Sequence, residues 1–119
     1  MVVSEARTLL FVYGSLKRGH ASHGELRGAR FVMEACTSRH FSLREIDGFP
    51  ALVPGARAII GELFEVEPEL LPALDTFEGE GYRRQEIELA DGTRAITYLA
   101  RSPTGGTAMA LDEWHASRR

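Results

Sequence analysis

The sequence predicts an α+β fold in which a small, closed or nearly closed sheet carries helices on its outside. Most apolar segments are short, rich in strand-forming residues and bounded by glycine, proline or aspartate turns. A firm helical spacing of apolar residues is seen in one place, after Pro68. A chain of 119 residues can bury one sizeable core but not two, so we expect residues 1–119 to form a single domain.

The expected strands follow one another with short turns between them. In order they cover residues 8–13, 31–33, 39–43, 51–53, 58–66, 86–89 and 95–99. The first is almost continuously apolar, which is typical of a strand covered on both faces. The longest contains Gly61, which indicates a bulge or a close backbone approach. Residues 47–50 are expected to form a turn, and Asp91-Gly92 is a strong two-residue hairpin signal.

Two helices are expected. The first begins at Pro68 and is indicated by a three-to-four spacing of Leu70, Leu71, Leu74 and Phe77. Glycines in the segment 79–81 end it. A final short helix is expected over 108–114, covering one side of the core with Leu111 and Trp114. The C-terminal residues, about the last fifteen of the chain, are therefore read as a helix or a frayed tail.

The composition limits the classes of function. The chain is 44% hydrophobic and 26% charged, as in soluble globular proteins. Its net charge of −3 argues against nucleic acid or an anionic membrane as the main partner. No apolar run approaches the roughly 20 residues of a membrane helix, and no secretory signal is evident. One cysteine, Cys36, allows no intrachain disulfide. We therefore expect a cytoplasmic protein and, from its size, a monomer.

The stretch after the first strand, residues 12–19 (VYGSLKRG), is the most informative. Gly14 has no Cβ, so backbone N–H groups around it can point toward a ligand. Lys17 and Arg18 add positive charge at the same mouth. The pattern indicates an anion-holding loop, although a strand followed by an ordinary polar turn fits as well. The phosphate-loop pattern is absent, which argues against a nucleotide site.

A carboxylate at the end of the first helix is the second unusual feature. Glu78 lies beside Phe77 and Tyr82, where the helix gives way to a glycine-flanked loop. Burial there would raise its pKa toward the range useful for a general base. The alternative is that Glu78 and Glu80 are solvated loop carboxylates and that Tyr82 only begins the next strand.

Taken in order, these stretches resemble the γ-glutamylcyclotransferase-like (AIG2-like) family. The resemblance extends from about Leu9 to Tyr98 and rests on 12–19 with His23, 48–53, 61–66, Leu74-Asp75 with Glu78, and 82–84. It implies a small mixed β-barrel with flanking helices. It also implies release of 5-oxoproline from a γ-glutamyl amide, as the substrate's α-amine attacks its own γ-carbonyl and expels an amine.

The resemblance also implies roles for individual residues. Glu78 matches the family's catalytic glutamate, which moves the protons, and its spacing from Asp75 favours it over the competing Glu80. Tyr82 is a further binding candidate, unless it is only a packed aromatic. The backbone N–H groups of the substrate loop hold the α-carboxylate or the oxyanion, and this loop matches Tyr13, Gly14, Ser15 and Leu16. No metal or other cofactor is implied, and the partner is a small γ-glutamyl molecule.

Other candidate residues have plainer interpretations. His20 and His23 lack a further ligand at metal-binding spacing, so we expect His23 to brace the loop by hydrogen bonding. We expect Pro50 to be a turn residue and Asp75 to be structural, and Ser15 lacks the setting of a nucleophile. Two other functions stay open at this point: a non-catalytic module that binds a small carboxylate, and a related lyase-type reaction on another amide.

Overall fold

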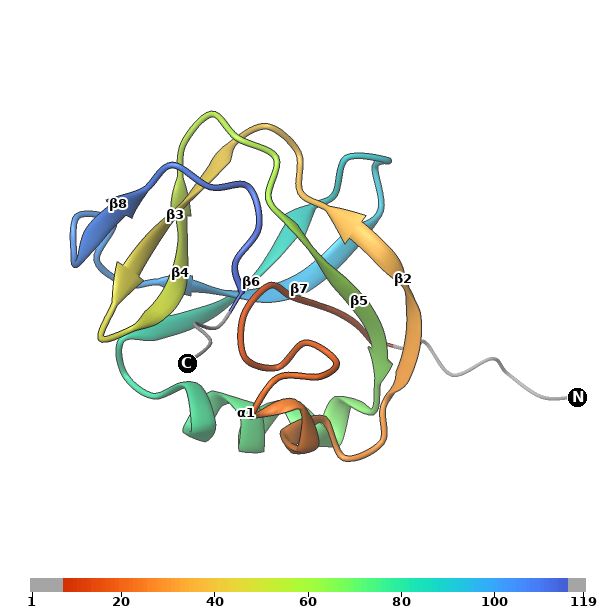
Figure 1. The fold of residues 1–119 in the computed structure, drawn as a ribbon. Helices are drawn as coiled ribbons and strands as arrows, with labels where there is room; N and C mark the ends of the chain where they lie inside the picture. Colours follow the sequence, from red (N-terminus) through yellow and green to blue (C-terminus); the bar gives the residue numbers. More distant parts are fainter. Residues whose placement is uncertain (1–7, 116–119) are drawn as a thin grey trace, which may run out of the picture.

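The computed structural model describes residues 8–115, which form one curled sheet with helical turns along one end (Figure 1). Within these residues the sheet has eight strands. They are β1 (Thr8–Val12), β2 (Arg30–Cys36), β3 (Phe41–Ile46), β4 (Phe49–Pro54), β5 (Ile60–Val66), β6 (Tyr82–Glu88), β7 (Arg94–Ala100) and β8 (Thr107–Met109).

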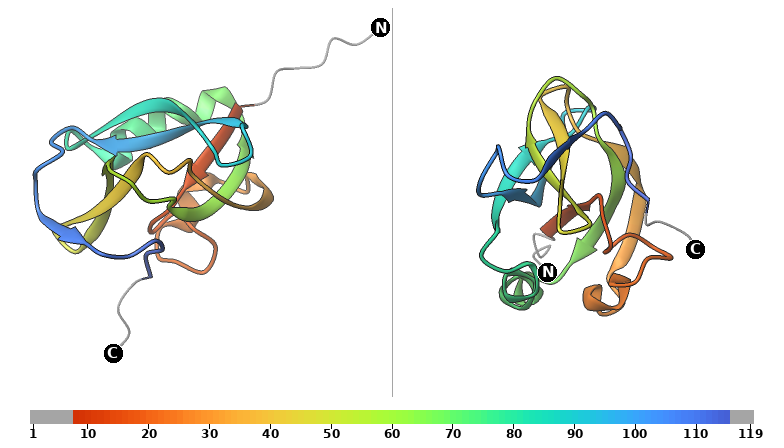
Figure 2. Two further views of the ribbon diagram at one scale, coloured as in Figure 1. Left: turned by 90° about the horizontal axis from the view of Figure 1, so that it is seen from above. Right: turned by 60° about the vertical axis from the view of Figure 1, so that its left-hand side comes forward.

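The strand order is β2-β5-β1-β7-β4-β3-β8, and β6 pairs with β7 off this path. The sheet is mixed because β7 runs parallel to β1 and β4 while the other pairs are antiparallel. Figure 2 shows the sheet curling around its interior as a half-barrel, with α1 below one open end. The predicted fold class, α+β with a small mixed barrel-like sheet and flanking helices, is confirmed.

The helical segments of the described chain are η1 (His23–Leu26), η2 (Pro68–Leu70) and α1 (Leu71–Glu78). Leu70, Leu71 and Leu74 are buried as the spacing predicts, whereas Phe77 is exposed. Gly79 follows with a φ of 83°, a left-handed conformation that favours glycine and ends the helix. Within 8–115, no helix has the length and apolar character that crossing a membrane requires.

The core lies on both faces of β1. Phe11 and Tyr13 belong to a cluster inside the curl with Leu52, Leu99 and Trp114. The residues that alternate with them along β1, Leu10 and Val12, belong to a second cluster between the sheet and the helical turns. This cluster also contains Leu26, Phe64 and Leu74. Successive side chains of a strand point to opposite faces, so this strand is covered on both sides, as its continuous apolar run predicts.

Gly61 marks a close backbone approach, one of the two interpretations that the sequence left open. A Cβ at this position would collide with the Val12 carbonyl oxygen and lie 2.7 Å from the Phe11 ring. The bulge lies instead on the neighbouring β2, where the register with β5 shifts between Phe31 and Met33. Gly61 therefore lets β5 pack tightly against the end of β1, from which the candidate substrate loop emerges.

Two turns differ in length from the prediction: the one at residues 47–50 is shorter, and the one at Asp91-Gly92 is longer. Asp47 and Gly48 both have positive φ between the paired residues Ile46 and Phe49, so the turn is a two-residue type I′ turn and β4 already starts at Phe49. The Asp91-Gly92 hairpin is present, but its loop has three residues (90–92). The Leu89 N–H donates to the Thr93 carbonyl at 2.7 Å, which closes the loop one position outside the predicted turn.

The helix predicted over 108–114 is wrong. Residues 107–109 form β8, which pairs with β3, and the chain then continues without a helix to 115. Backbone bonds to neighbouring strands replace helical ones, including that from the Ile60 N–H to the Asp112 carbonyl at 2.7 Å. Trp114 is buried in the core as expected, whereas Leu111 is exposed. Residues 116–119, expected to fray, lie outside the described residues.

One edge of β7 is shared between two strands. β6 pairs with the opposite edge along the whole strand. On the shared edge, Ile96 pairs with Leu10 of β1, and Leu99 pairs with Leu52 of β4. After β1 ends, the chain turns away from β7 before β4 begins to pair with it. This leaves a split in the sheet between β1 and β4, and the loop after β1 enters the split.

The side chain of Tyr13 closes this split. It is buried, and its hydroxyl accepts a hydrogen bond from the Leu52 N–H at 3.0 Å and donates one to the Tyr98 carbonyl at 2.6 Å. Burial is the main reason that the pKa of Tyr13 lies well above its usual value, so the hydroxyl keeps its proton. The first residue after β1 thereby links the backbones of β4 and β7.

We predict that Tyr13→Phe lowers the free energy of unfolding by about 1–3 kcal/mol, because a buried N–H and a carbonyl lose their partner. Tyr82→Phe is the matched control, since its hydroxyl makes a single part-buried hydrogen bond, to the Pro50 carbonyl. That variant should lose less than about 1 kcal/mol. Urea denaturation of the three proteins measures both values, and equal stability of Tyr13→Phe and the parent would contradict the linking role.

Candidate functional site

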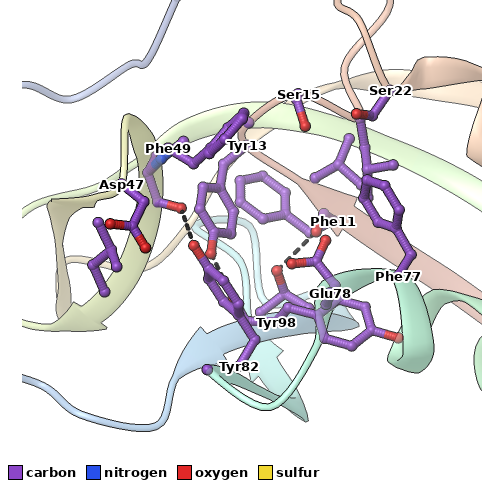
Figure 3. Close-up of a pocket in the computed structure, with 17 residues that line it drawn as sticks. Phe11, Tyr13, Ser15, Ser22, Asp47, Phe49, Phe77, Glu78, Tyr82 and Tyr98 are labelled. Atoms are coloured by element: carbon purple, nitrogen blue, oxygen red, sulfur yellow. Dashed lines mark hydrogen bonds between the residues drawn. The ribbon is translucent and has the colours of Figure 1, made fainter. Parts of the chain in front are cut away.

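A pocket of about 570 Å³ opens at the split in the sheet, in the size range of small-molecule sites. Its wall is built by the loop after β1, the β3–β4 turn, the end of α1, the start of β6 and the middle of β7 (Figure 3). The structure brings every residue predicted for the site to this pocket: Tyr13, Gly14, Ser15, Leu16, Glu78 and Tyr82.

The loop after β1 is held by hydrogen bonds to its own carbonyl groups. The backbone N–H groups of Lys17 and Ser22 donate to the carbonyl oxygens of Gly14 and Ser15, both at 3.0 Å. A third donor, in the side chain of His23, bonds to the Leu16 carbonyl at 2.9 Å. The last donor is the Nδ1–H of His23, which confirms the predicted bracing role. The N–H groups of Ser15 and Leu16 have no acceptor among residues 8–115. Both residues line the pocket, and unpaired backbone N–H groups in such a loop are the donors with which proteins bind anionic groups.

Gly14 and Pro50 form a tight part of the wall. A Cβ on Gly14 would lie 2.9 Å from Cγ of Pro50, so any larger residue would push the loop and β4 apart. Pro50 is a buried strand residue that lines the pocket, which corrects its expected place in a turn. Its carbonyl accepts a hydrogen bond from the Tyr82 hydroxyl at 3.0 Å.

The two basic residues of the loop do not contribute to the pocket. Lys17 is buried elsewhere and its Nζ donates to the Trp114 carbonyl at 2.6 Å; burial lowers its pKa. Arg18 pairs with Glu62 at 3.3 Å, and its guanidinium carbon lies 3.6 Å from the centre of the Phe31 ring. The expected positive charge at the mouth is therefore wrong, because both cations bind other parts of the fold.

Glu78, the last residue of α1, lines the pocket beside Phe77. No donor among the described residues hydrogen-bonds its carboxylate. Burial therefore acts alone and raises the pKa of Glu78 from an ordinary 4.5 to about 7. Near neutral pH the group is divided between its charged and protonated forms, so it can both accept and donate a proton.

The neighbouring carboxylates have different environments. Glu80 is exposed and does not line the pocket. Asp75 accepts a hydrogen bond from the Tyr98 hydroxyl at 2.6 Å and lies 3.4 Å from the Arg84 guanidinium. These contacts fit the expected structural role of Asp75. Burial and the hydrogen bond to Asp75 raise the pKa of Tyr98, so its hydroxyl remains a donor.

Tyr82 lies between two carboxylates in the pocket, Glu78 on one side and Asp47 on the other (Figure 3). Burial, reinforced by the charges of these two groups, raises the pKa of Tyr82 to about 12. Asp47 belongs to the type I′ turn between β3 and β4. Sequence reasoning identified that turn, but nothing in the sequence shows that β4 pairs with β7 and thereby brings the turn to the pocket.

Sequence reasoning also missed four aromatic residues of the pocket, Phe11, Phe49, Phe77 and Tyr98. Phe49 and Phe77 are large apolar side chains that remain exposed, 52% and 41% respectively, at the pocket wall. Tyr98 comes from β7. The apolar spacing of α1 assigns Phe77 to the core; its exposure shows that the pocket begins where the helix leaves the core. Among residues 8–115, no three side chains of the metal-binding types come together.

Comparison with known proteins identifies the family of the chain and agrees with its fold. The family described as "Gamma-glutamyl cyclotransferase, AIG2-like" matches residues 10–116. A Vibrio cholerae protein named "Putative gamma-glutamylcyclotransferase" is 33% identical over 90 residues, covering 74% of this chain and 78% of that protein. "Gamma-glutamylaminecyclotransferase C" of Danio rerio is 35% identical over 92 residues, covering 67% of this chain and 60% of that protein.

A solved structure supports the fold. The crystal structure of an AIG2-like protein from Mus musculus superposes with a TM-score of 0.80, covering 93% of this chain and 90% of that one, at 24% identity. The match to the family extends over the loop after β1, the β3–β4 turn and the end of α1, which are parts of the pocket wall.

We predict that Glu78→Gln stabilises the protein at pH 8 by about 1–3 kcal/mol. The folded state binds a proton at Glu78 up to about pH 7, whereas the unfolded chain releases it near 4.5. Stability of the parent therefore falls as pH rises through this window and is level above it. Denaturation at pH 4, 6 and 8 tests this: the difference between the two proteins should be near zero at pH 4, and a constant difference would contradict it.

Proposed function

Since this chain belongs to the AIG2-like gamma-glutamyl cyclotransferase family, we propose that it releases 5-oxoproline from a γ-glutamyl amide with Glu78 as the proton-transferring group. The observation that carries the proposal is the partly buried carboxyl of Glu78, which has a pKa of about 7 and no hydrogen-bond partner in the protein between residues 8 and 115. Glu78 lines the same pocket as Ser15 and Leu16, whose backbone N–H groups have no acceptor within residues 8–115.

The reaction requires a proton to be moved twice. The substrate's α-nitrogen forms a bond to its own γ-carbon, and the bond from that carbon to the leaving nitrogen breaks. Glu78 takes the proton that the attacking nitrogen loses and delivers it to the departing amine. A pKa near the working pH suits a group that performs both transfers. No covalent intermediate with the protein is needed, in agreement with the lack of an activated nucleophile at Ser15.

The loop after β1 supplies the other contribution. The N–H groups of Ser15 and Leu16 would stabilise negative charge, either the substrate's α-carboxylate or the oxygen of the attacked carbonyl. In the first case the loop fixes the glutamyl group in the curled conformation that brings nitrogen and carbon together. The close contact of Gly14 with Pro50 keeps these donors in place.

We predict that Glu78→Gln lowers kcat for 5-oxoproline release by about 10²–10⁴-fold, the usual range for loss of a general acid–base group. Purified protein is incubated with γ-glutamyl dipeptides and with γ-glutamyl-ε-lysine, and 5-oxoproline is measured by chromatography. In the parent, kcat/KM should rise with pH through about 7, because the charged carboxylate is the base.

Glu80→Gln is the matched control, since it removes the same charge from an exposed neighbour outside the pocket. It should keep its activity within about twofold. Full activity of a folded Glu78→Gln protein would refute the role of Glu78. If 5-oxoproline raises the melting temperature but no γ-glutamyl compound is turned over, the protein is a binding module for small carboxylates instead.

A further inference from the structure

The charged side chains that line the pocket are all acidic. The lining includes two carboxylates, Asp47 and Glu78, and no lysine, arginine or histidine. Asp47 is exposed at the rim, on the far side of Tyr82 from Glu78 (Figure 3). No cationic side chain pairs with Asp47 in the part of the chain that the structure describes. The proposed reaction uses Glu78 and the loop after β1, and it leaves Asp47 without a task.

Apolar surface lies next to Asp47. Ile46 precedes it and Phe49 follows its turn, and both side chains line the same pocket. Phe49 is 52% exposed, although a phenylalanine of this size is normally buried. An exposed aromatic in a pocket indicates a surface that a ligand covers. The pocket volume of about 570 Å³ leaves room for more than a glutamyl group.

We propose that Asp47 and Phe49 form the subsite for the leaving group, and that it selects amines carrying a second positive charge at the end of an apolar stem. This inference rests on the proposed cyclotransferase function. The substrate class is a γ-glutamyl derivative of an aliphatic diamine, with its stem against Phe49 and its free ammonium at Asp47. Ring closure converts it to 5-oxoproline and the diamine, and no other reactant is required.

The same charges disfavour other leaving groups. An amine that carries a carboxylate would place a negative charge near Asp47 with no lysine, arginine or histidine in the pocket to compensate it. A neutral alkyl amine would keep the apolar contact with Phe49 and lose the ion pair. The subsite therefore ranks diamine, neutral amine and amino acid in that order.

The backbone of Asp47 allows a clean substitution. Its φ of 54° is left-handed, a conformation that asparagine tolerates as well as aspartate does. Asp47→Asn therefore removes the charge and keeps the turn. Glu45→Gln is the matched control, because Glu45 is an exposed carboxylate on β3 that does not line the pocket.

Three γ-glutamyl amides of equal stem length test the proposal: those of diaminobutane, pentylamine and aminopentanoate. In the parent, kcat/KM for the diamine should exceed that for pentylamine by about threefold to fivefold, as for an exposed ion pair, and aminopentanoate should be slowest. High salt should reduce the ratio. Asp47→Asn should bring the diamine-to-pentylamine ratio close to one, and Glu45→Gln should leave it unchanged. An unchanged ratio in Asp47→Asn overturns the proposal.

A binding measurement separates this proposal from the function on which it rests. The Kd values of the diamine and pentylamine compounds are measured by calorimetry on Glu78→Gln and on the double variant with Asp47→Asn. Tighter binding of the diamine compound that is lost in the double variant supports the subsite even if no 5-oxoproline forms. Equal Kd values for both compounds on Glu78→Gln overturn it, whether or not the parent is active.

Discussion

The hydroxyl of Tyr13 is the contact on which the site depends. It joins the backbones of β4 and β7 at the point where the partner of β7 on this edge changes from β1 to β4. A split sheet would normally expose unpaired N–H and carbonyl groups to the core, and burying them unpaired is unfavourable. Because one side chain satisfies both strands, the chain can leave β1 and turn back as a loop. The pocket exists because the sheet is split here and remains stable.

Burial of Glu78 lowers the stability of the folded protein near neutral pH and gives the carboxyl a pKa suited to proton transfer. The helix α1 ends on this carboxylate and offers it no donor, so its charged form is destabilised near neutral pH. The same environment gives it a pKa at which it can exchange protons with a substrate. A protein that kept Glu78 only for its fold would gain stability by replacing it, which is the trade-off expected at functional sites.

Much of this arrangement is readable from the sequence, and the rest depends on tertiary contacts. Local signals predicted the α+β class and the helix after Pro68, and they offered the close approach at Gly61 as one of two interpretations, since turn chemistry and apolar spacing act within a few residues. The helix predicted over 108–114 does not form, because this segment makes its backbone hydrogen bonds with β3 and Ile60, which are distant in the sequence. The local sequence places Lys17 at the mouth of a ligand site, whereas its actual partner, the Trp114 carbonyl, is 97 residues away.

The site shows the same division. The sequence indicates Glu78 because it lies at the end of a helix and precedes glycines, and because its spacing from Asp75 resembles that of a known family. Asp47 was read as part of a turn, since only the pairing of β4 with β7 brings that turn opposite Glu78.

The pKa of Glu78 tests its role in catalysis directly, and it can be measured by a ¹³C NMR titration of the glutamate carboxyl groups between pH 3 and 10. The Glu78→Gln protein, which lacks one carboxyl signal, identifies the resonance. We expect a midpoint close to 7 for this carboxyl in the free protein. A midpoint near the ordinary 4.5 would show that the carboxylate is solvated, and would contradict both its burial and its proposed role in moving protons.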